Sequence, residues 1–233
     1  VAARVIARTR VPVMNETSSR SRRLLDPLFT TEAMRAVFSD HGRLQAMLDF
    51  EAALARAEAA VGVIPESAAA AIAAKCRAEL YDVDVLAAAA ATAGNLAIPL
   101  VKELTARVAQ SDPRAARFVH WGATSQDVID TGLVLQLRAA CDLIEADVEA
   151  LASAIARLAR THARTPLAAR TLLQHALPTT FGLKLAGWLD ALERDRARLR
   201  AARERILVLQ FGGAAGTLAA LGGHGLAVAA ALA

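Results

Sequence analysis

One long run of apolar residues at helical spacing limits what this chain can fold into. Between residues 128 and 162, apolar side chains recur in steps of three and four at Val134, Leu137, Cys141, Ile144, Val148, Leu151, Ile155 and Leu158. These eight residues, called the long-helix seam below, predict a single α-helix of about 35 residues, roughly 50 Å long at 1.5 Å per residue. A helix of this length needs partners of similar length, so we expect an elongated helical bundle with subunit contacts.

A second long helix is predicted after a polar interruption at residues 170–180, which we interpret as a loop. Its apolar positions follow the same steps, at Trp188, Leu192, Leu199, Ala202 and Ile206. Residues 206–233 contain no Asp, Glu, Lys or Arg, and their length alone would fit a membrane span. Gln210, His224 and six glycines argue against a span, so we expect this segment to pack in the bundle core, without a membrane partner.

The remaining sequence is also helical in character. The composition is 55% hydrophobic but only 4% aromatic, and alanine, which has the best helix propensity, is abundant. Shorter helices are expected to begin at Thr30 or Thr31, at Ser39 or Asp40, at Pro65, and at Asp82 or Asp84. We therefore predict an all-α fold with a helical N-terminal domain at residues 24–113 and a central long-helix bundle domain at residues 114–233.

The positive charge of the chain is concentrated at its start. The net charge is +4, but residues 1–23 hold six arginines and one acid, or +5, which leaves −1 for the rest. The body shows no basic stripe for a phosphate backbone, so nucleic acid is not an expected partner. We interpret residues 1–23 as a disordered leader with Met14 as a candidate start, although a transit peptide has a similar composition. The isolated Cys76 and Cys141 fit a reduced, cytoplasmic protein.

The densest group of chemically useful side chains lies just before the long helix. His120, Thr124, Ser125, Gln126 and Asp127 fall within eight residues. Thr124 or Ser125 can cap the helix, and Thr124 has the spacing of a capping box with Asp127. First-turn amides and the positive end of the helix dipole would then lie beside His120, which favours an anionic ligand. The alternative is a plain helix cap; no His/Cys cluster has metal-ligand spacing, so no metal is expected.

Four segments resemble, in the same order, the fumarase/aspartase superfamily of homotetrameric, all-α enzymes. They are residues 93–102, 120–127, 174–182 and 210–217, and the resemblance extends over residues 25–233. The closest similarity is to the 3-carboxy-cis,cis-muconate cycloisomerase branch of protocatechuate catabolism. The resemblance implies a fumarase/aspartase-like long-helix bundle, a small tricarboxylate substrate, intramolecular lyase chemistry that closes a lactone, no cofactor, and a homotetramer assembled through the long helices.

The resemblance also implies roles for individual residues. The stretch at residues 120–125 matches the one that binds a substrate carboxylate, and residues 171–175 fall in a second active-site stretch. The expected catalytic residues are His175, His120 and Ser125. The expected substrate-binding residues are Asn95, Thr124, Gln126, Arg170, Thr171 and Gln174. His175 is the candidate for proton transfer, with a structural histidine bonded to a helix end as the alternative.

Leu172 departs from the superfamily pattern. Lyases of the superfamily carry a histidine there that acts in proton transfer, so Leu172 disfavours an adenylosuccinate or argininosuccinate lyase. A C–N lyase and a non-catalytic helical scaffold remain as alternatives. The third superfamily stretch, a flexible serine-containing loop, is absent from the sequence. We therefore expect the central domain to be incomplete at its C-terminus and the 233-residue chain alone to turn over little substrate.

Overall fold

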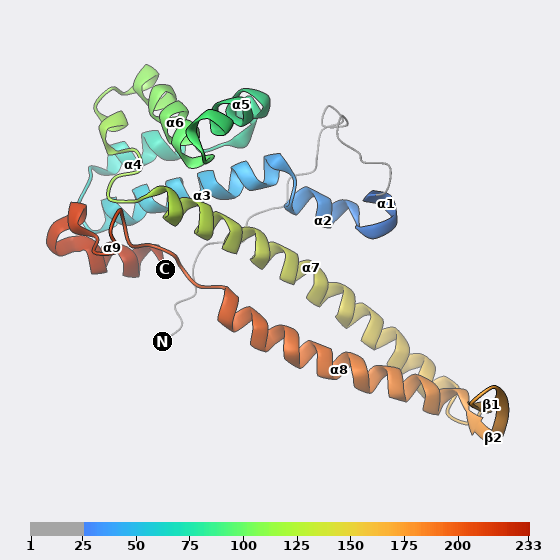
Figure 1. The fold of residues 1–233 in the computed structure, drawn as a ribbon. Coiled ribbons are helices and arrows are strands. Elements are labelled where there is room, and N and C mark those ends of the chain that lie inside the picture. The colour runs from blue at the N-terminus through green and yellow to red at the C-terminus, as the bar shows by residue number, and fades with distance from the viewer. Residues whose placement is uncertain (1–25) are drawn as a thin grey trace. The chain divides into compact units, whose positions relative to one another are not determined.

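A computed structural model describes residues 26–233, and all its elements but one hairpin are helical (Figure 1). The predicted leader lies outside the described residues. In order, the elements are α1 (Asp26–Phe29), α2 (Glu32–Val37), α3 (Asp40–Ala60), α4 (Glu66–Ala73), η2 (Ala78–Leu80), α5 (Val83–Ala93), α6 (Ala97–Ser111), η3 (Ala115–Phe118), α7 (Ser125–Thr161), β1 (Pro166–Thr171), β2 (Gln174–Thr180), α8 (Phe181–Ile206), η4 (Ala219–His224) and α9 (Gly225–Leu232). The predicted all-α class and the two long helices are confirmed.

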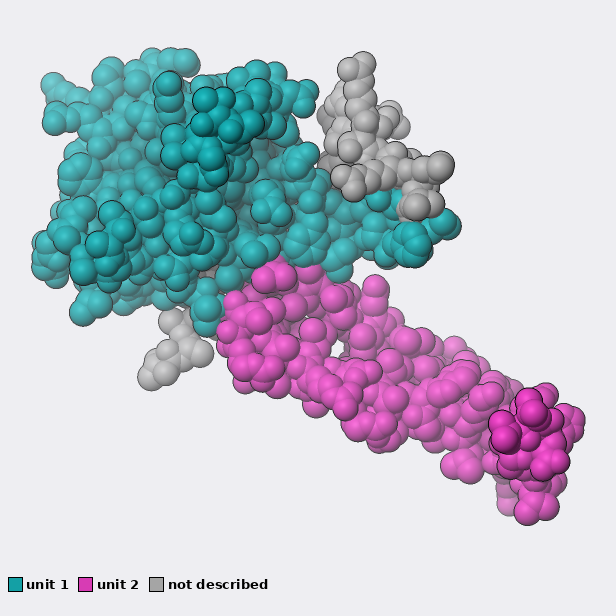
Figure 2. Space-filling model, in the orientation of Figure 1, with its two compact units in different colours: residues 1–136, 208–233 teal, residues 137–207 magenta. Residues whose placement is uncertain are grey.

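The chain divides into two compact units, shown in different colours in Figure 2. Unit 1 contains the N-terminal part of the chain through Gln136 together with Val208–Ala233, and unit 2 is Leu137–Leu207. The boundary between the units falls within α7, which begins in unit 1 and continues into unit 2. The domains expected at residues 24–113 and 114–233 stay a prediction.

Short polar side chains start the first helices of unit 1. The Thr31 hydroxyl accepts a hydrogen bond from the Met34 amide at 3.2 Å, and the Ser39 hydroxyl accepts from the Gly42 amide at 3.0 Å. The Asp82 carboxylate accepts from two amides at the start of α5. Each bond satisfies an amide that has no partner inside its helix, so these predicted helix starts are confirmed.

The core of unit 1 is built around α3. Met47, Leu48, Phe50 and Leu54 are buried along this helix, and α6 contributes Leu100, Leu104 and Val108. The apolar C-terminal segment joins the same core, since α9 contacts α3 and buries Val228 and Leu232. This agrees with the expected packing of residues 206–233. Among the described residues, no helix has both the length and the apolar character to cross a bilayer.

The Asp127 carboxylate fastens the segment after α8 to the start of α7. Its Oδ1 accepts from the Gly212 amide at 3.0 Å, and its Oδ2 accepts from Gly213 at 2.9 Å and from Thr124 at 3.0 Å. The side chain is fully buried. Gly213 has a φ of +68°, and a Cβ there would lie 2.7 Å from the Gly122 carbonyl oxygen, so only glycine fits this close approach.

A second tie between the same segments lies one turn further along α7. The Thr131 hydroxyl donates to the Gln210 carbonyl at 2.9 Å and accepts from the Gln210 amide at 3.1 Å. Thr131 and Asp127 both lie on the buried face of α7. Together they hold residues 210–213 along the first two turns of the helix. Of the capping box predicted between Thr124 and Asp127, one bond is present, from the Thr124 amide to the Asp127 carboxylate.

In unit 2 the rest of α7 runs beside α8. Arg203 of α8 pairs with Asp142 at 2.6 Å and with Glu145 at 3.4 Å, and Arg196 pairs with Glu149. The long-helix seam is covered only in part. Cys141 and Ile155 are buried, as expected for packing positions, whereas Ile144 is 41% and Leu151 49% exposed within this chain.

The predicted loop between the long helices is instead a β-hairpin. β1 and β2 are antiparallel, with a register shift between Ala168 and Arg170, and Leu172 and Leu173 form the turn. Two leucines give no turn signal, since tight turns favour Gly and Asn, and Leu173 takes a φ of +60° that leucine rarely adopts. The local sequence therefore does not predict a hairpin between the two long helices.

Asp127→Ala is expected to lower the free energy of unfolding by about 3 kcal/mol, because it leaves three amides without their charged acceptor. Urea unfolding followed by circular dichroism measures the change. The matched control is Asp130→Ala on the same helix, where an exposed pair with Gln126 is lost and the expected cost is below about 0.5 kcal/mol. Equal costs for the two variants would show that Asp127 does not fasten the two segments.

Candidate functional site

The polar stretch predicted as an anion site forms the turn that leads into α7. Ser125 is the first residue of the helix, and Thr124 occupies the cap position, with its carbonyl accepting from Asp127 at 3.0 Å. Among the described residues, the amides of Ser125 and Gln126 and the hydroxyls of Thr124 and Ser125 have no hydrogen-bond partner. These donors at the positive end of a 37-residue helix are suited to an anionic ligand.

Two residues of this stretch are already engaged. The Gln126 side-chain amide donates one hydrogen to Asp130 at 2.6 Å, which leaves its second N–H for a ligand. Asp127 faces inward and accepts the three amides described above. The Gly212 and Gly213 amides are therefore used to hold the fold and are not available to a ligand.

His120 is anchored by a residue that sequence reasoning missed. Its Nδ1 lies 2.6 Å from Oε1 of Glu51, a fully buried carboxylate on α3. Burial lowers the pKa of His120, but the hydrogen bond to Glu51 and the charges of Glu51 and Asp127 outweigh this effect and raise it above 6.5. Glu51 could have been noticed, because it interrupts the apolar face formed by Met47, Leu48 and Leu54.

Glu58 is a second buried acid on the same helix. Neither of its carboxyl oxygens has a hydrogen-bond partner among residues 26–233, and the side chain is fully buried. Burial, with a further contribution from the charge of Glu51, raises the pKa of Glu58 from 4.5 to about 8. The carboxyl is thus mostly protonated at pH 7, which avoids a second buried charge near Glu51.

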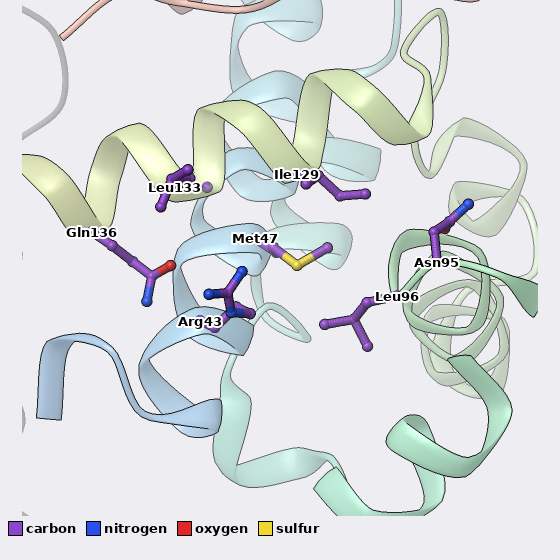
Figure 3. Close-up of a pocket in the computed structure, with 8 residues that line it drawn as sticks. Arg43, Met47, Asn95, Leu96, Ile129, Leu133 and Gln136 are labelled. Carbon is purple, nitrogen blue, oxygen red and sulfur yellow. The ribbon is translucent and has the colours of Figure 1, made fainter. Parts of the chain in front are cut away.

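A pocket of about 220 Å³ lies within unit 1 and includes another predicted site residue, Asn95 (Figure 3). Its wall is largely apolar, with one cation, Arg43, and the Gln136 amide. Asn95 Oδ1 accepts from the Ile98 amide at 3.1 Å and so helps to start α6, while its NH₂ group has no partner among residues 26–233. His120 does not line this pocket.

The other predicted site residues gather at the end of the hairpin in unit 2. Arg170 is directly opposite His175, and Thr171 is opposite Gln174. Because successive strand residues point to opposite faces, the first pair shares one face and the second pair shares the other. All four side chains are exposed. The hairpin thus brings the second stretch together; its joint action with the His120 stretch stays a prediction.

The described residues contain no group of three or more His, Cys, Asp or Glu side chains placed to hold a metal ion. The chemically useful groups described above are hydrogen-bond donors, one buried His–Glu pair and an Arg–His pair on a hairpin. Such groups bind carboxylates and move protons.

This helical fold, with hydrogen-bond donors gathered at the start of a long helix, is of the lyase type. The chain belongs to the lyase family, whose sequence model matches residues 29–233. It is 65% identical over 210 residues to the 3-carboxy-cis,cis-muconate cycloisomerase of Pseudomonas aeruginosa, a match that covers 90% of this chain and 46% of the relative.

Two other similarities bear on fold and chemistry. The crystal structure of the 3-carboxy-cis,cis-muconate lactonizing enzyme from Pseudomonas putida is similar with a TM-score of 0.86 at 62% identity, over 91% of this chain and 48% of that one. The nitrosuccinate lyase of Streptomyces davaonensis is 50% identical over 196 residues, or 84% of this chain and 41% of the relative. The fumarase/aspartase-like fold is thereby confirmed, and the chain spans about half the length of the curated relatives it matches.

Glu58→Gln is expected to remove a pH-dependent cost of folding. The raised pKa means that the unfolded chain loses this proton more easily, so the folded state loses stability as the pH rises from about 4.5 to 8. Gln matches the protonated carboxyl and cannot ionise. The gain in unfolding free energy should grow from near zero below pH 4.5 to on the order of 3 kcal/mol at pH 7.

Urea unfolding of both proteins across this pH range measures the difference. The control is Glu66→Gln in the first turn of α4, where the acid is exposed and should show no comparable pH dependence. A gain for Glu58→Gln that is the same at pH 4.5 and pH 7 would contradict the assignment of a raised pKa.

Proposed function

We propose that this chain forms part of a cytoplasmic 3-carboxy-cis,cis-muconate cycloisomerase. The enzyme would interconvert 3-carboxy-cis,cis-muconate and a carboxymuconolactone in protocatechuate (β-ketoadipate) catabolism. The observation that carries the proposal is the 65% identity with the Pseudomonas aeruginosa relative of that name, which extends over 90% of the chain. The free donors beside His120 support it, because a tricarboxylate substrate needs such groups.

The proposed reaction is an internal addition. One substrate carboxylate attacks a carbon of a double bond conjugated to a second carboxylate, and a C–O bond forms. The displaced electron pair builds a dianionic enolate on that second carboxylate, and a proton added to the neighbouring carbon completes the lactone. No atom other than this proton is gained and no electron is transferred, so the protein must supply fixed donors and one acid.

The start of α7 is suited to hold the charged substrate. The free amides of Ser125 and Gln126 and the hydroxyls of Thr124 and Ser125 can donate to a carboxylate or to the enolate. His120, with its raised pKa, adds a cationic donor. Charge-assisted hydrogen bonds of this kind are about twice as strong as neutral ones, which favours the transition state as charge accumulates on oxygen.

The hairpin supplies the groups proposed for proton transfer. Arg170 and His175 share a face, so the guanidinium can hold a carboxylate while the imidazole delivers a proton. Thr171 and Gln174 lie on the opposite face of the hairpin, so in this proposal they do not contact the substrate held by Arg170 and His175. Superfamily active sites combine stretches from different subunits, which would allow a hairpin from one subunit to meet the His120 stretch of another.

Elimination from a succinate-type substrate is the second candidate. It is favoured by the 50% identity with the nitrosuccinate lyase of Streptomyces davaonensis. Elimination and cyclisation both pass through a carboxylate-stabilised carbanion, so the same donors serve both. Leu172 argues for cyclisation, because the position offers no proton-transfer group and is 86% exposed at the hairpin turn.

Activity distinguishes the candidates. A chimera in which residues 29–233 replace the matching part of the Pseudomonas aeruginosa relative is incubated with 3-carboxy-cis,cis-muconate or with nitrosuccinate. Loss of the diene ultraviolet absorbance with the first compound supports the proposal, and release of nitrite from the second alone would overturn it. The 233-residue chain is assayed in parallel, with turnover well below that of the chimera expected.

In the chimera, His120→Ala and Ser125→Ala are expected to lower kcat/KM roughly 10²- to 10³-fold while changing Tm little, because both remove a donor to developing charge. The matched control is Ser153→Ala, an exposed serine further along α7, which should leave kcat/KM unchanged. Full activity of both site variants would show that this stretch acts only as a helix cap.

We further propose a homotetramer assembled through the long helices. The support is the partial exposure of the long-helix seam at Ile144 and Leu151, together with exposed Trp188 on α8. Apolar side chains of this size are stabilised when another helix removes them from water, each by about 1.5 to 3 kcal/mol.

Leu151→Asp is expected to convert the assembly into monomers or aggregates, because it places an unpaired charge in the seam. Size-exclusion chromatography with light scattering on the 233-residue chain measures the mass. Ala150→Asp, one residue away and exposed outside the seam, should keep the wild-type mass. A tetramer that survives Leu151→Asp with unchanged stability would refute assembly through the seam.

A further inference from the structure

His120 is held in place from behind by a side chain that comes from a distant part of the sequence. Glu51 lies 69 residues earlier, on α3, and its Oε1 contacts the Nδ1 of His120 at 2.6 Å. The Glu51 side chain is fully buried, whereas the side chain of His120 keeps 15% of its surface exposed. The other ring nitrogen, Nε2, has no hydrogen-bond partner among the described residues and is not a buried atom, so it is accessible to a ligand.

We propose that Glu51 is a positioning residue of the active site, which fixes the proton on Nδ1 of His120 and directs Nε2 to a carboxylate of the substrate as an imidazolium donor. This inference rests on the proposed function. It adds Glu51 of α3 to the proposed active site and assigns a protonation state to His120.

The backbone of His120 supports a positional role. Its φ is +59°, in the left-handed region where a non-glycine residue costs on the order of 1 kcal/mol or more. Such a conformation persists only when its surroundings determine it, and the bond to Glu51 is the side-chain interaction that does so here. The turn thus stores strain in order to present this ring at the start of α7.

The chemistry of the pair determines which nitrogen can bind a ligand. A carboxylate accepts hydrogen bonds, so Nδ1 must carry the hydrogen that it donates to Glu51. In a neutral ring Nε2 would then be an acceptor and would repel a substrate carboxylate. In the imidazolium Nε2 carries a hydrogen as well, and the ring donates to both carboxylates at once.

The charges around the ring favour that cationic form. Burial alone would lower the pKa of His120, but Glu51 and Asp127 raise it above its ordinary value. Glu58, the other buried acid of α3, is mostly protonated at pH 7 and adds little charge. Glu51 is thus the dominant partner, and its removal should leave burial as the main influence and return the ring to its neutral form.

The test is an NMR titration of the 233-residue chain labelled with ¹⁵N in its five histidines. In the wild type, the ¹⁵N shifts should show hydrogen on Nδ1 in the neutral ring and on both nitrogens below the pKa. Glu51→Gln should lower the His120 pKa, because the carboxylate charge that raises it is removed. Glu58→Gln, which removes a buried acid of the same helix without touching His120, should leave it unchanged.

Binding is measured in parallel with propane-1,2,3-tricarboxylate as an unreactive probe, by calorimetry between pH 5.5 and 8. At pH 7.5, Glu51→Gln should weaken binding several-fold, because fewer of the His120 rings are cationic, and lowering the pH to 5.5 should restore it. Glu58→Gln should bind like the wild type throughout. Glu51→Asp, which keeps the charge at a longer distance, should fall between Glu51→Gln and the wild type.

Three results would overturn the inference. They are hydrogen on Nε2 alone in the neutral wild-type ring, an unchanged His120 titration in Glu51→Gln, and a loss of probe affinity in this variant that does not depend on pH. If Glu51→Gln does not fold, the inference is tested by the ¹⁵N shifts of the wild type and by the titration and probe binding of Glu51→Asp. Failure of the wild-type chain and of the chimera to bind the probe would instead count against the proposed function, while the titration still decides the Glu51–His120 coupling.

Discussion

The burial of one carboxylate, Asp127, determines how the start of the long helix is built. A buried charge is costly unless it is hydrogen-bonded, and here three amides from two segments donate to Asp127. Because Asp127 takes the amides of Gly212 and Gly213, the two segments are fixed to each other, and these two amides are not available to a ligand. The same carboxylate also contributes to the raised pKa of His120, so it links the stability of unit 1 to the charge of the candidate site.

Helix α3 carries two buried acids, each of which has a cost in folding stability. Its core face carries Glu51 and Glu58 between large apolar side chains, and both are fully buried. One is compensated by a histidine and the other by keeping its proton, which are the two ways a protein avoids an isolated buried charge. An apolar residue at either position would pack at lower cost. Glu51 has an evident reason to be there in its contact with His120, and nothing in the structure explains Glu58.

The sequence was sufficient for the elements that depend on local chemistry. The seam periodicity predicted α7, and Thr31, Ser39 and Asp82 predicted helix starts, because caps and apolar spacing act within a few residues. It could not reveal the hairpin, whose turn consists of Leu172 and Leu173, nor the Glu51–His120 pair, because tertiary contacts across 69 residues leave no periodic signal. The grouping of Arg170 with His175 likewise follows from strand register, which the spacing of five residues alone does not define.

The ties between α7 and residues 210–213 also have a consequence for synthesis. Gly212 lies 85 residues after Asp127, so a nascent chain exposes the start of α7 long before its partners leave the ribosome. At about 5 to 20 residues per second, this interval lasts on the order of ten seconds. During that time the Asp127 carboxylate lacks two of its three amide donors, although Glu51, the partner of His120, has already been made. The start of α7 therefore completes its hydrogen bonds only after residues 210–213 have been made.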